Sequence, residues 1–227
     1  MNSLQQSTPN DSGGTGSSMN DTWQKRPNSD QIPCPALMSF YNHGWLVPDE
    51  HGNVSLSHLD DVLARAGISA RIRKVLEKGA EKTDDIPNSF NLFALRNSSL
   101  DHSGSTSVRD PEVNPEKLES ALLQFGKDGR MYAEHFAAAA SHAAQQDPGI
   151  KGTLTQTVEL TSVLEVFGRV DESNRRYLTN EDVQGLWIDG RFPKDWHPRA
   201  SAEIDGIQLL GGVTKMLFQR GLKAIGF

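Results

Sequence analysis

The chain has 227 residues, a length that suits one domain of ordinary size with a core large enough to enclose a cofactor. Its formal net charge of −6 and the lack of a dense Lys/Arg run argue against a general attraction to nucleic acid or to an anionic membrane. No segment approaches the roughly 20 consecutive apolar residues of a transmembrane helix. The sequence therefore predicts neither nucleic acid nor membrane as a partner.

The first thirty residues are rich in Ser, Gly, Asn, Pro and Gln and lack the apolar stretch of a secretory signal. We expect residues 1–30 to be a disordered N-terminal tail, followed by a single domain over residues 31–227. A single cysteine, Cys34, excludes an intramolecular disulfide and suits a reducing compartment. These features predict an intracellular, cytoplasmic protein.

After the tail, the pattern predicts helices joined by polar loops, with strand signals nearly absent. Ser55 opens a helix that stops at Gly67, and a second helix follows whose inner stripe is Ile72, Val75 and Leu76. Further helices are predicted from residue 115 and over residues 131–146, 155–167, 180–188 and 206–222. No internal repeat with a period of 20 to 50 residues is found. The sequence thus predicts an all-α fold, a single helical domain.

The cysteine lies in the segment IPCPALMSFYNHGW. Pro33 and Pro35 stiffen the backbone on both sides of Cys34, and residues 36–41 have helical spacing, with Gly44 after them. A short helix would hold Cys34 near its N-terminus, where free amide groups and the helix dipole favour a thiolate. The residues alone leave three interpretations open: a structural cysteine, a catalytic nucleophile or a metal ligand.

PCPAL at 33–37 with NHG at 42–44 closely resembles the PCP segment of fungal haem-thiolate peroxidases, the family of chloroperoxidase and the unspecific peroxygenases. In that family the cysteine between the prolines is the proximal haem ligand. The resemblance runs from about residue 33 to residue 198 and implies a fold that encloses haem b. It also implies the residues that hold the haem: Cys34 as the iron ligand, with Pro33, Pro35 and Ala36 beside it.

A second segment, DHSGSTSVRD at 101–110, is similar to the family run EHDGSLSR-x-D. There the Glu, the Ser and a haem propionate help to bind a divalent cation, and the His with its following Asp belongs to the distal hydrogen-bond network. The resemblance implies His102 as a distal residue, with Asp101 and Ser105 as oxygen ligands for Mg²⁺ or Mn²⁺. Ser103 replaces the Asp, and a neutral hydroxyl stabilises an imidazolium less well than a carboxylate. The alternative interpretation is a polar turn.

A third segment, TQTVELTSVLEVFGR at 155–169, resembles the family helix that carries the distal catalytic Glu, which matches Glu159. Periodicity places Glu159 on one stripe with Val163 and Val166, whereas Glu165 falls among polar residues. We therefore expect Glu159 to face inward and to act in acid–base chemistry, and a carboxylate that reaches solvent is the alternative. Apolar residues near the distal segments are candidates for pocket walls or for ordinary core: Phe90, Leu92, Phe93, Val163, Leu164 and Phe167.

The last matching segment runs from Leu186 to Pro198 and resembles the family's closing motif, FF-x-x-ERLP-x-x-x-GW-x-P. Gly190 stands where the family has Glu. We expect this segment to support the fold. We expect His43, in the NHG element, to organise the chain around the proximal loop and not to bind iron.

Together these matches imply a haem-thiolate peroxidase or peroxygenase that uses hydrogen peroxide to oxidise or oxygenate a small organic molecule, with fungal secondary metabolism as its setting. Glu159 would act as the general acid–base and His102 would tune it. A monomer or weak oligomer is expected. Two alternatives stay open. One is a haem-binding protein with reduced or lost peroxide chemistry, suggested by the departures at Asp101, Ser103 and Gly190, and the other is a non-catalytic helical interaction module.

Overall fold

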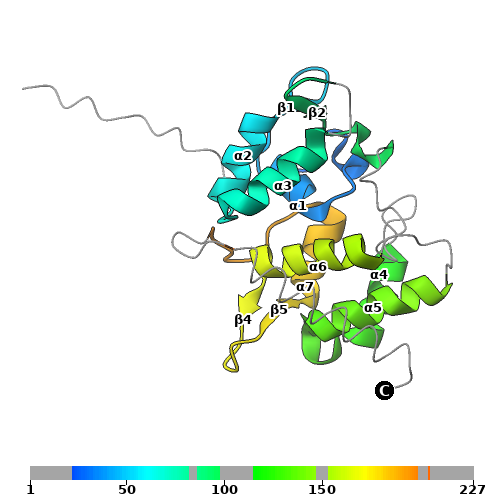
Figure 1. The fold of residues 1–227 in the computed structure, drawn as a ribbon. Helices are drawn as coiled ribbons and strands as arrows, with labels where there is room; N and C mark the ends of the chain where they lie inside the picture. Colours follow the sequence, from blue (N-terminus) through cyan, green and yellow to red (C-terminus); the bar gives the residue numbers. More distant parts are fainter. Residues whose placement is uncertain (1–21, 82–85, 98–114, 147–152, 199–203, 205–227) are drawn as a thin grey trace, which may run out of the picture.

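The computed structural model describes residues 22–81, 86–97, 115–146, 153–198 and Ile204 (Figure 1). This part of the chain holds seven α-helices and two small antiparallel sheets, so the fold is mixed α/β and the predicted all-α class is wrong. The elements in chain order are η1 (Ser29–Gln31), α1 (Pro35–Asn42), β1 (Asn53–Ser55), α2 (Leu56–Arg65), α3 (Ala70–Glu81), β2 (Ser89–Asn91), η2 (Ala94–Asn97), α4 (Pro115–Phe125), η3 (Lys127–Gly129), β3 (Arg130–Tyr132), α5 (Ala133–Gln146), α6 (Thr153–Phe167), β4 (Arg169–Val170), β5 (Arg176–Thr179), α7 (Asn180–Gln184) and η4 (Gly185–Asp189).

The sequence did not predict the strands because they are short. The shortest has 2 residues and the longest 4, too few for the alternation that identifies a strand in sequence. Each main ladder is centred on one buried apolar pair, Val54 with Phe90 between β1 and β2, and Met131 with Leu178 between β3 and β5. Residues 131 and 132 were predicted to begin a helix, but they belong to β3, and α5 begins after them.

A helix–strand–helix arrangement occurs in both halves of the described chain. β1 joins α1 to α2 and pairs with the strand that follows α3, while β3 joins α4 to α5 and pairs with the strand between α6 and α7. In both halves a strand ends on a residue that caps the next helix: the Ser55 Oγ accepts from the His58 amide, and the Thr179 Oγ1 accepts from the Asp182 amide. The repetition is architectural, which explains why no sequence repeat predicted it.

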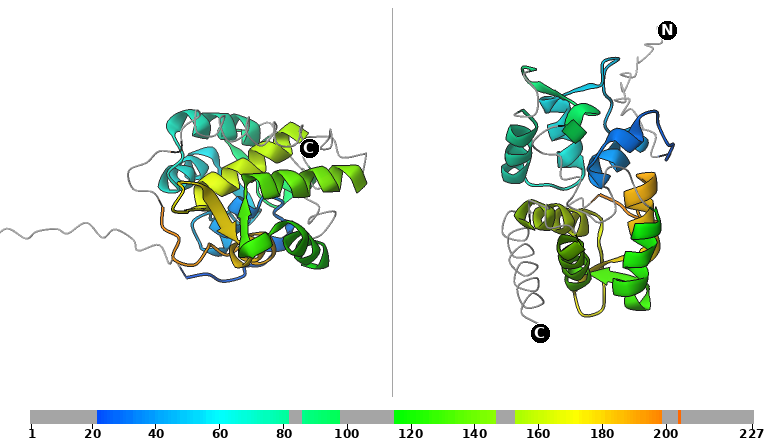
Figure 2. Two further views of the ribbon diagram at one scale, coloured as in Figure 1. Left: turned by 90° about the horizontal axis from the view of Figure 1, so that it is seen from below. Right: turned by 90° about the vertical axis from the view of Figure 1, so that its right-hand side faces the viewer.

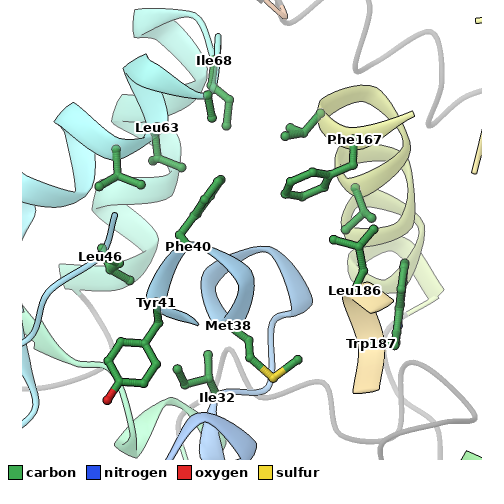
Figure 3. Packing of buried hydrophobic residues seen from close by; sticks show 14 of the residues in the cluster. Ile32, Met38, Phe40, Tyr41, Leu46, Leu63, Ile68, Phe167, Leu186 and Trp187 are labelled. Atoms are coloured by element: carbon green, nitrogen blue, oxygen red, sulfur yellow. The ribbon is translucent and has the colours of Figure 1, made fainter. Parts of the chain in front are cut away.

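The two halves of the chain stack on each other, with α1 and α6 at the boundary. The right-hand view of Figure 2 shows residues 22–97 above and residues 115–198 below. The apolar core fills the space between them: Figure 3 shows Phe40 of α1 directed between Leu63 and Ile68 on one side and Phe167 of α6 on the other. Within the described residues, no helix is long and apolar enough to cross a membrane.

Part of the predicted disordered tail, residues 22–30, is an ordered segment along α1. The Gln24 amide donates to the Asn42 carbonyl at 3.0 Å, and the Arg26 amide donates to the Asn42 Oδ1 at 3.1 Å. The Tyr41 hydroxyl donates to the Pro27 carbonyl at 2.9 Å. Composition predicted disorder because the partners that hold this segment belong to α1, outside the tail itself. Residues 1–21 lie outside the described part.

Helix α3 departs from its predicted orientation. Its expected inner stripe was Ile72, Val75 and Leu76, but Val75 is 64% exposed and Leu76 is 42% exposed. Ala80 is buried instead, and Ile72 is half-buried. Periodicity identified residues that share a face, but the helix packs on its neighbour along a different edge.

Candidate functional site

Cys34 is the N-cap residue of α1, which confirms the predicted short helix with the cysteine at its start. Its backbone is extended, with φ −83° and ψ 119°, and its carbonyl accepts the first helical hydrogen bond, from the Met38 amide at 2.9 Å. Pro35 occupies the first helical position, where its missing amide hydrogen costs nothing. The amide groups of the first turn have no acceptors within the helix, so the positive end of the helix dipole lies beside Cys34.

Cys34 lies between two prolines in a rigid part of the chain and is partly accessible to solvent. Cys34, Pro33 and Ala36 are half-buried, and Pro35 is buried. Ala36 also packs against the main apolar core, as does Leu37. A cysteine that serves only as a small apolar filler is usually buried completely. The half-buried position of Cys34 therefore fits a ligand or a nucleophile better than a filler.

His43, which ends α1, is part of the fold. Its side chain is buried, and its ring stacks on Phe192 with centroids 3.8 Å apart and an interplanar angle of 11°. The Phe192 amide donates to its Nε2 at 3.1 Å. Because Nε2 accepts a hydrogen bond, this nitrogen carries no proton. His43 thus fastens α1 to a segment about 150 residues later in the chain, a partner that the sequence did not predict.

The turn at residues 189–190 approaches α1 closely. The Asn42 Nδ2 donates to the Asp189 carbonyl at 2.8 Å. Gly190 has a left-handed backbone with φ +58°, and a Cβ there would lie 2.6 Å from the Met38 Cγ. A glutamate, which the resembling family has at this position, would not fit this geometry. Close packing against α1 therefore explains why this chain has a glycine and not a glutamate at position 190.

An aromatic cluster joins the turn to α1 and to α6. Phe192 contacts Phe40, Trp45, Phe167 and Trp196, with ring centroids between 4.6 and 5.9 Å away. The Trp196 Nε1 donates to a backbone carbonyl near the end of α6 at 2.8 Å. The segments of the family resemblance that contain Cys34 and Trp196 thus meet in one packed unit, as expected for structural support.

Helix α6 contains Glu159, as predicted, but the side chain of Glu159 is outside the described part of the structure. Phe40 of α1 and Phe167 of α6 have ring centroids 6.0 Å apart, so the C-terminal halves of these helices meet. Glu159 precedes Phe167 by about 12 Å along the helix axis, at 1.5 Å per residue. Its inward orientation and its chemistry stay predictions.

Periodicity predicts an inward Glu159 only if α6 has an outer, polar face. Thr161 is buried, and no residue from 160 to 167 is exposed. Glu165 is half-buried and forms an ion pair with Arg176, whose Nε lies 2.6 Å from its Oε2. The polar side of the helix is therefore enclosed by its neighbours as well.

The predicted distal and cation-binding residues, His102, Ser103, Asp101 and Ser105, lie outside the described residues. The Mg²⁺ or Mn²⁺ site stays a prediction. Within the described ranges, no group of three or more His, Cys, Asp or Glu side chains could hold a metal ion. Five of the six candidate wall residues are buried in the core: Phe90, Leu92, Val163, Leu164 and Phe167. The sixth, Phe93, is half-buried and packs against that core.

A charged network that sequence reasoning missed holds the closing segment. The Arg169 Nε donates to the Asp182 Oδ2 at 3.1 Å, and its Nη2 donates to the Lys194 carbonyl at 2.7 Å. Burial raises the pKa of Asp182, but hydrogen bonds from Arg169 and Thr179 outweigh this effect and hold the pKa below its usual value. The Thr-x-x-Asp spacing at 179–182 is the capping signal that could have located this carboxylate.

No model of a known protein family matches this chain, and no curated protein is significantly similar to it.

Proposed function

We propose that this protein is a haem-thiolate peroxidase or peroxygenase that binds haem b through Cys34 and uses hydrogen peroxide to oxidise or oxygenate a small organic molecule. The observation that carries the proposal is the position of Cys34 at the start of α1, between two prolines. The family resemblance of the segments that contain Cys34 and Glu159 supports it. A lone cysteine also suits a reducing compartment, so we place the reaction inside the cell, on a biosynthetic substrate.

The residues around Cys34 fit the thiolate ligand of a haem iron. The positive end of the α1 dipole lies beside Cys34 and would stabilise negative charge on the sulfur. Pro35 leaves one amide hydrogen fewer at this helix end, so the sulfur keeps electron density for a metal. Cys34 is half-buried, so it is partly accessible to a group that binds from outside the core.

A thiolate-ligated haem supplies cleavage of the peroxide O–O bond, which electron donation from the sulfur favours. Cys34 supplies the donor atom and α1 fixes its direction. Glu159, from α6, would take a proton from the inner oxygen of hydrogen peroxide and return it to the outer oxygen. His102 would position Glu159 and tune its charge, while Asp101 and Ser105 would hold the divalent cation.

Haem loading of a Cys34→Ser variant tests the ligand. The wild-type protein from haem-supplemented cells is expected to show the ferrous–CO band of a thiolate-ligated haem. The variant should lose that band while its far-UV circular dichroism stays unchanged. Purified wild-type protein without haem, or a variant with the same ferrous–CO band, would contradict the proposal.

Peroxide turnover then separates an enzyme from a haem-binding protein without this chemistry. Removing a general acid–base costs about 10²- to 10⁴-fold in rate, so Glu159→Gln should lower peroxide consumption by that order. Glu165→Gln is the matched control, because it changes another glutamate of α6 whose partner is Arg176. Equal rates for both variants would remove Glu159 from the mechanism.

A further inference from the structure

The hydrogen bond that joins α1 to the turn before Phe192 depends on the charge state of His43. His43 is the C-cap residue of α1, and its Nε2 lies 3.1 Å from the Phe192 amide nitrogen. A backbone amide can only donate, so Nε2 must be the acceptor. The contact therefore exists only while this nitrogen carries no proton.

A proton on Nε2 would remove the contact and leave nothing in its place. The protonated nitrogen would face the Phe192 N–H, so two donors would meet where one hydrogen bond now lies. His43 is only 6% exposed, so water cannot solvate the charged ring at its present position. Protonation therefore requires the ring to move away from Phe192.

The titratable and charged side chains on the elements around His43 do not favour a positive ring. They are Arg26, Tyr41, Arg65, Glu165, Asp189 and Arg191. Both carboxylates have arginine partners, since Asp189 lies 3.7 Å from the Arg191 Nη2 and Glu165 pairs with Arg176. Arg26 and Arg65 lie over the rings of Tyr41 and Trp45. These carboxylates are therefore already engaged, and the other charges in this set are positive.

The neighbouring residue, Asn42, holds the same helix end in a way that does not depend on pH. Its Oδ1 accepts from the Arg26 amide, and its Nδ2 donates to the Asp189 carbonyl at 2.8 Å. An amide side chain does not titrate. Loss of the His43 bond therefore loosens the end of α1 without detaching it from the turn.

Cys34 lies at the opposite end of α1 from His43. The two residues are separated by about 14 Å along the axis, at 1.5 Å per residue, so His43 does not contact the sulfur. A change at His43 can reach Cys34 only through the direction of the helix. This makes His43 a positioning residue and not a ligand.

We propose that His43 positions Cys34 in a pH-dependent way. The neutral ring holds the C-terminal end of α1 on the turn, and the protonated ring releases it and lets the helix change its direction. The release concerns the protein alone. Its effect on an iron ligand rests on the proposed haem binding at Cys34.

Nuclear magnetic resonance of the isotope-labelled full-length protein tests the release without haem. An unperturbed histidine titrates at about pH 6.5, so spectra are recorded from about pH 8 down to about pH 5. The Phe192 amide proton should shift upfield as its hydrogen bond is lost. Its midpoint should equal that of the His43 ring resonances, since one proton causes both changes.

His43→Gln is the conservative variant that separates titration from structure. The glutamine oxygen can accept from the Phe192 amide at every pH, and it takes up no proton in this range. The Phe192 amide resonance should therefore stay constant with pH in this variant. His43→Ala should show the released position at every pH. If His43→Ala does not fold, the wild type and His43→Gln still decide the question.

His58→Gln is the matched control. The His58 Nε2 also accepts from a backbone amide, that of Val47 at 3.1 Å, but this bond holds the loop after α1 and not the turn. The control should keep the pH response of Phe192. Loss of that response in His58→Gln, with its retention in His43→Gln, would assign the effect to α2.

The haem-loaded protein gives the readout for Cys34. In the wild type, the ferrous–CO band of a thiolate-ligated haem should decrease with the midpoint found for His43. His43→Gln should keep the band to lower pH. Protonation of the sulfur itself would act equally in both proteins, so the difference between them measures the contribution of His43.

The outcomes for the two proposals can be told apart. A coupled shift of His43 and Phe192 in a protein that never binds haem would refute the haem proposal and leave the release intact. Three results would overturn the release: a His43 ring that stays neutral until the protein unfolds, a Phe192 amide that does not follow it, or an unchanged pH response in His43→Gln. A haem band with the same pH dependence in wild type and His43→Gln would overturn the positioning of Cys34.

Discussion

Replacing Gly190 with alanine is expected to destabilise the protein through close contacts with α1. Gly190 lies in the turn that docks on α1, at φ +58°. The added Cβ would lie 2.6 Å from the Met38 Cγ and 2.7 Å from the Asn42 Nδ2. Both neighbours are buried, so they cannot move aside freely.

Two costs add at this position. A left-handed backbone costs a non-glycine residue roughly 1–2 kcal/mol. Overpacking against buried atoms costs typically about 1–3 kcal/mol more. We therefore expect Gly190→Ala to lower the free energy of unfolding by about 2–5 kcal/mol. Gly129→Ala is the matched control, because Gly129 has φ +69° and its Cβ would meet nothing within 4 Å.

Urea denaturation, followed by circular dichroism and by tryptophan fluorescence, measures both variants. In Gly129→Ala the free energy of unfolding should fall only by the cost of the left-handed backbone, about 1–2 kcal/mol. The loss of unfolded-state entropy on adding a methyl group is common to both variants and cancels in the comparison. If Gly190→Ala costs no more than Gly129→Ala, the turn does not pack tightly on α1 and the explanation for this glycine is wrong.

Two further predictions concern the closing segment. Trp196→Phe removes the indole donor to the backbone carbonyl of α6 and should cost about 1–2 kcal/mol in urea denaturation, whereas Trp23→Phe, at a 38% exposed position, should cost less than half as much. Asp182→Asn should cost about 2 kcal/mol at pH 7, a value reduced because Arg169 is partly exposed. Because the pKa of Asp182 is lowered in the folded protein, its carboxylate contributes to the free energy of unfolding above about pH 4, and this contribution is lost as the pH falls through the folded pKa. The free energy of unfolding of the variant should therefore fall less steeply than that of the wild type as the pH is lowered.

Local sequence patterns predicted where the helices lie better than they predicted which residues pack around them. The helix opened by Ser55 was predicted because a capping residue and an apolar stripe agree, and α2 ends at Arg65, just before the predicted stop. On α3 the stripe was correct, but the direction of the core was not, since two of its residues, Val75 and Leu76, are exposed. Which face turns inward depends on neighbours that are distant in sequence.

In the candidate site, too, local sequence predicted some features, and others depend on residues that are distant in sequence. The position of Cys34 followed from two prolines and a helical run within ten residues, all of it local information. The fit of Gly190 did not, because the atoms that require a glycine belong to α1. The close packing around Thr161 was missed for a related reason: over residues 160–167 no side chain of α6 is exposed, so this part of the helix has no outer face for periodicity to detect.

The anchoring of α1 explains how a turn far away in sequence can control Cys34. The helix is 8 residues long, about 12 Å, and its C-terminal end is held by the Asn42 hydrogen bonds and by the stack of His43 on Phe192. A tilt of about 10° around that end would move Cys34 by about 2 Å. A misplacement of about 1 Å can cost a hundredfold in catalysis. If Cys34 binds haem iron as proposed, the turn at Gly190 is therefore part of what positions the ligand, although it contacts neither the sulfur nor the substrate.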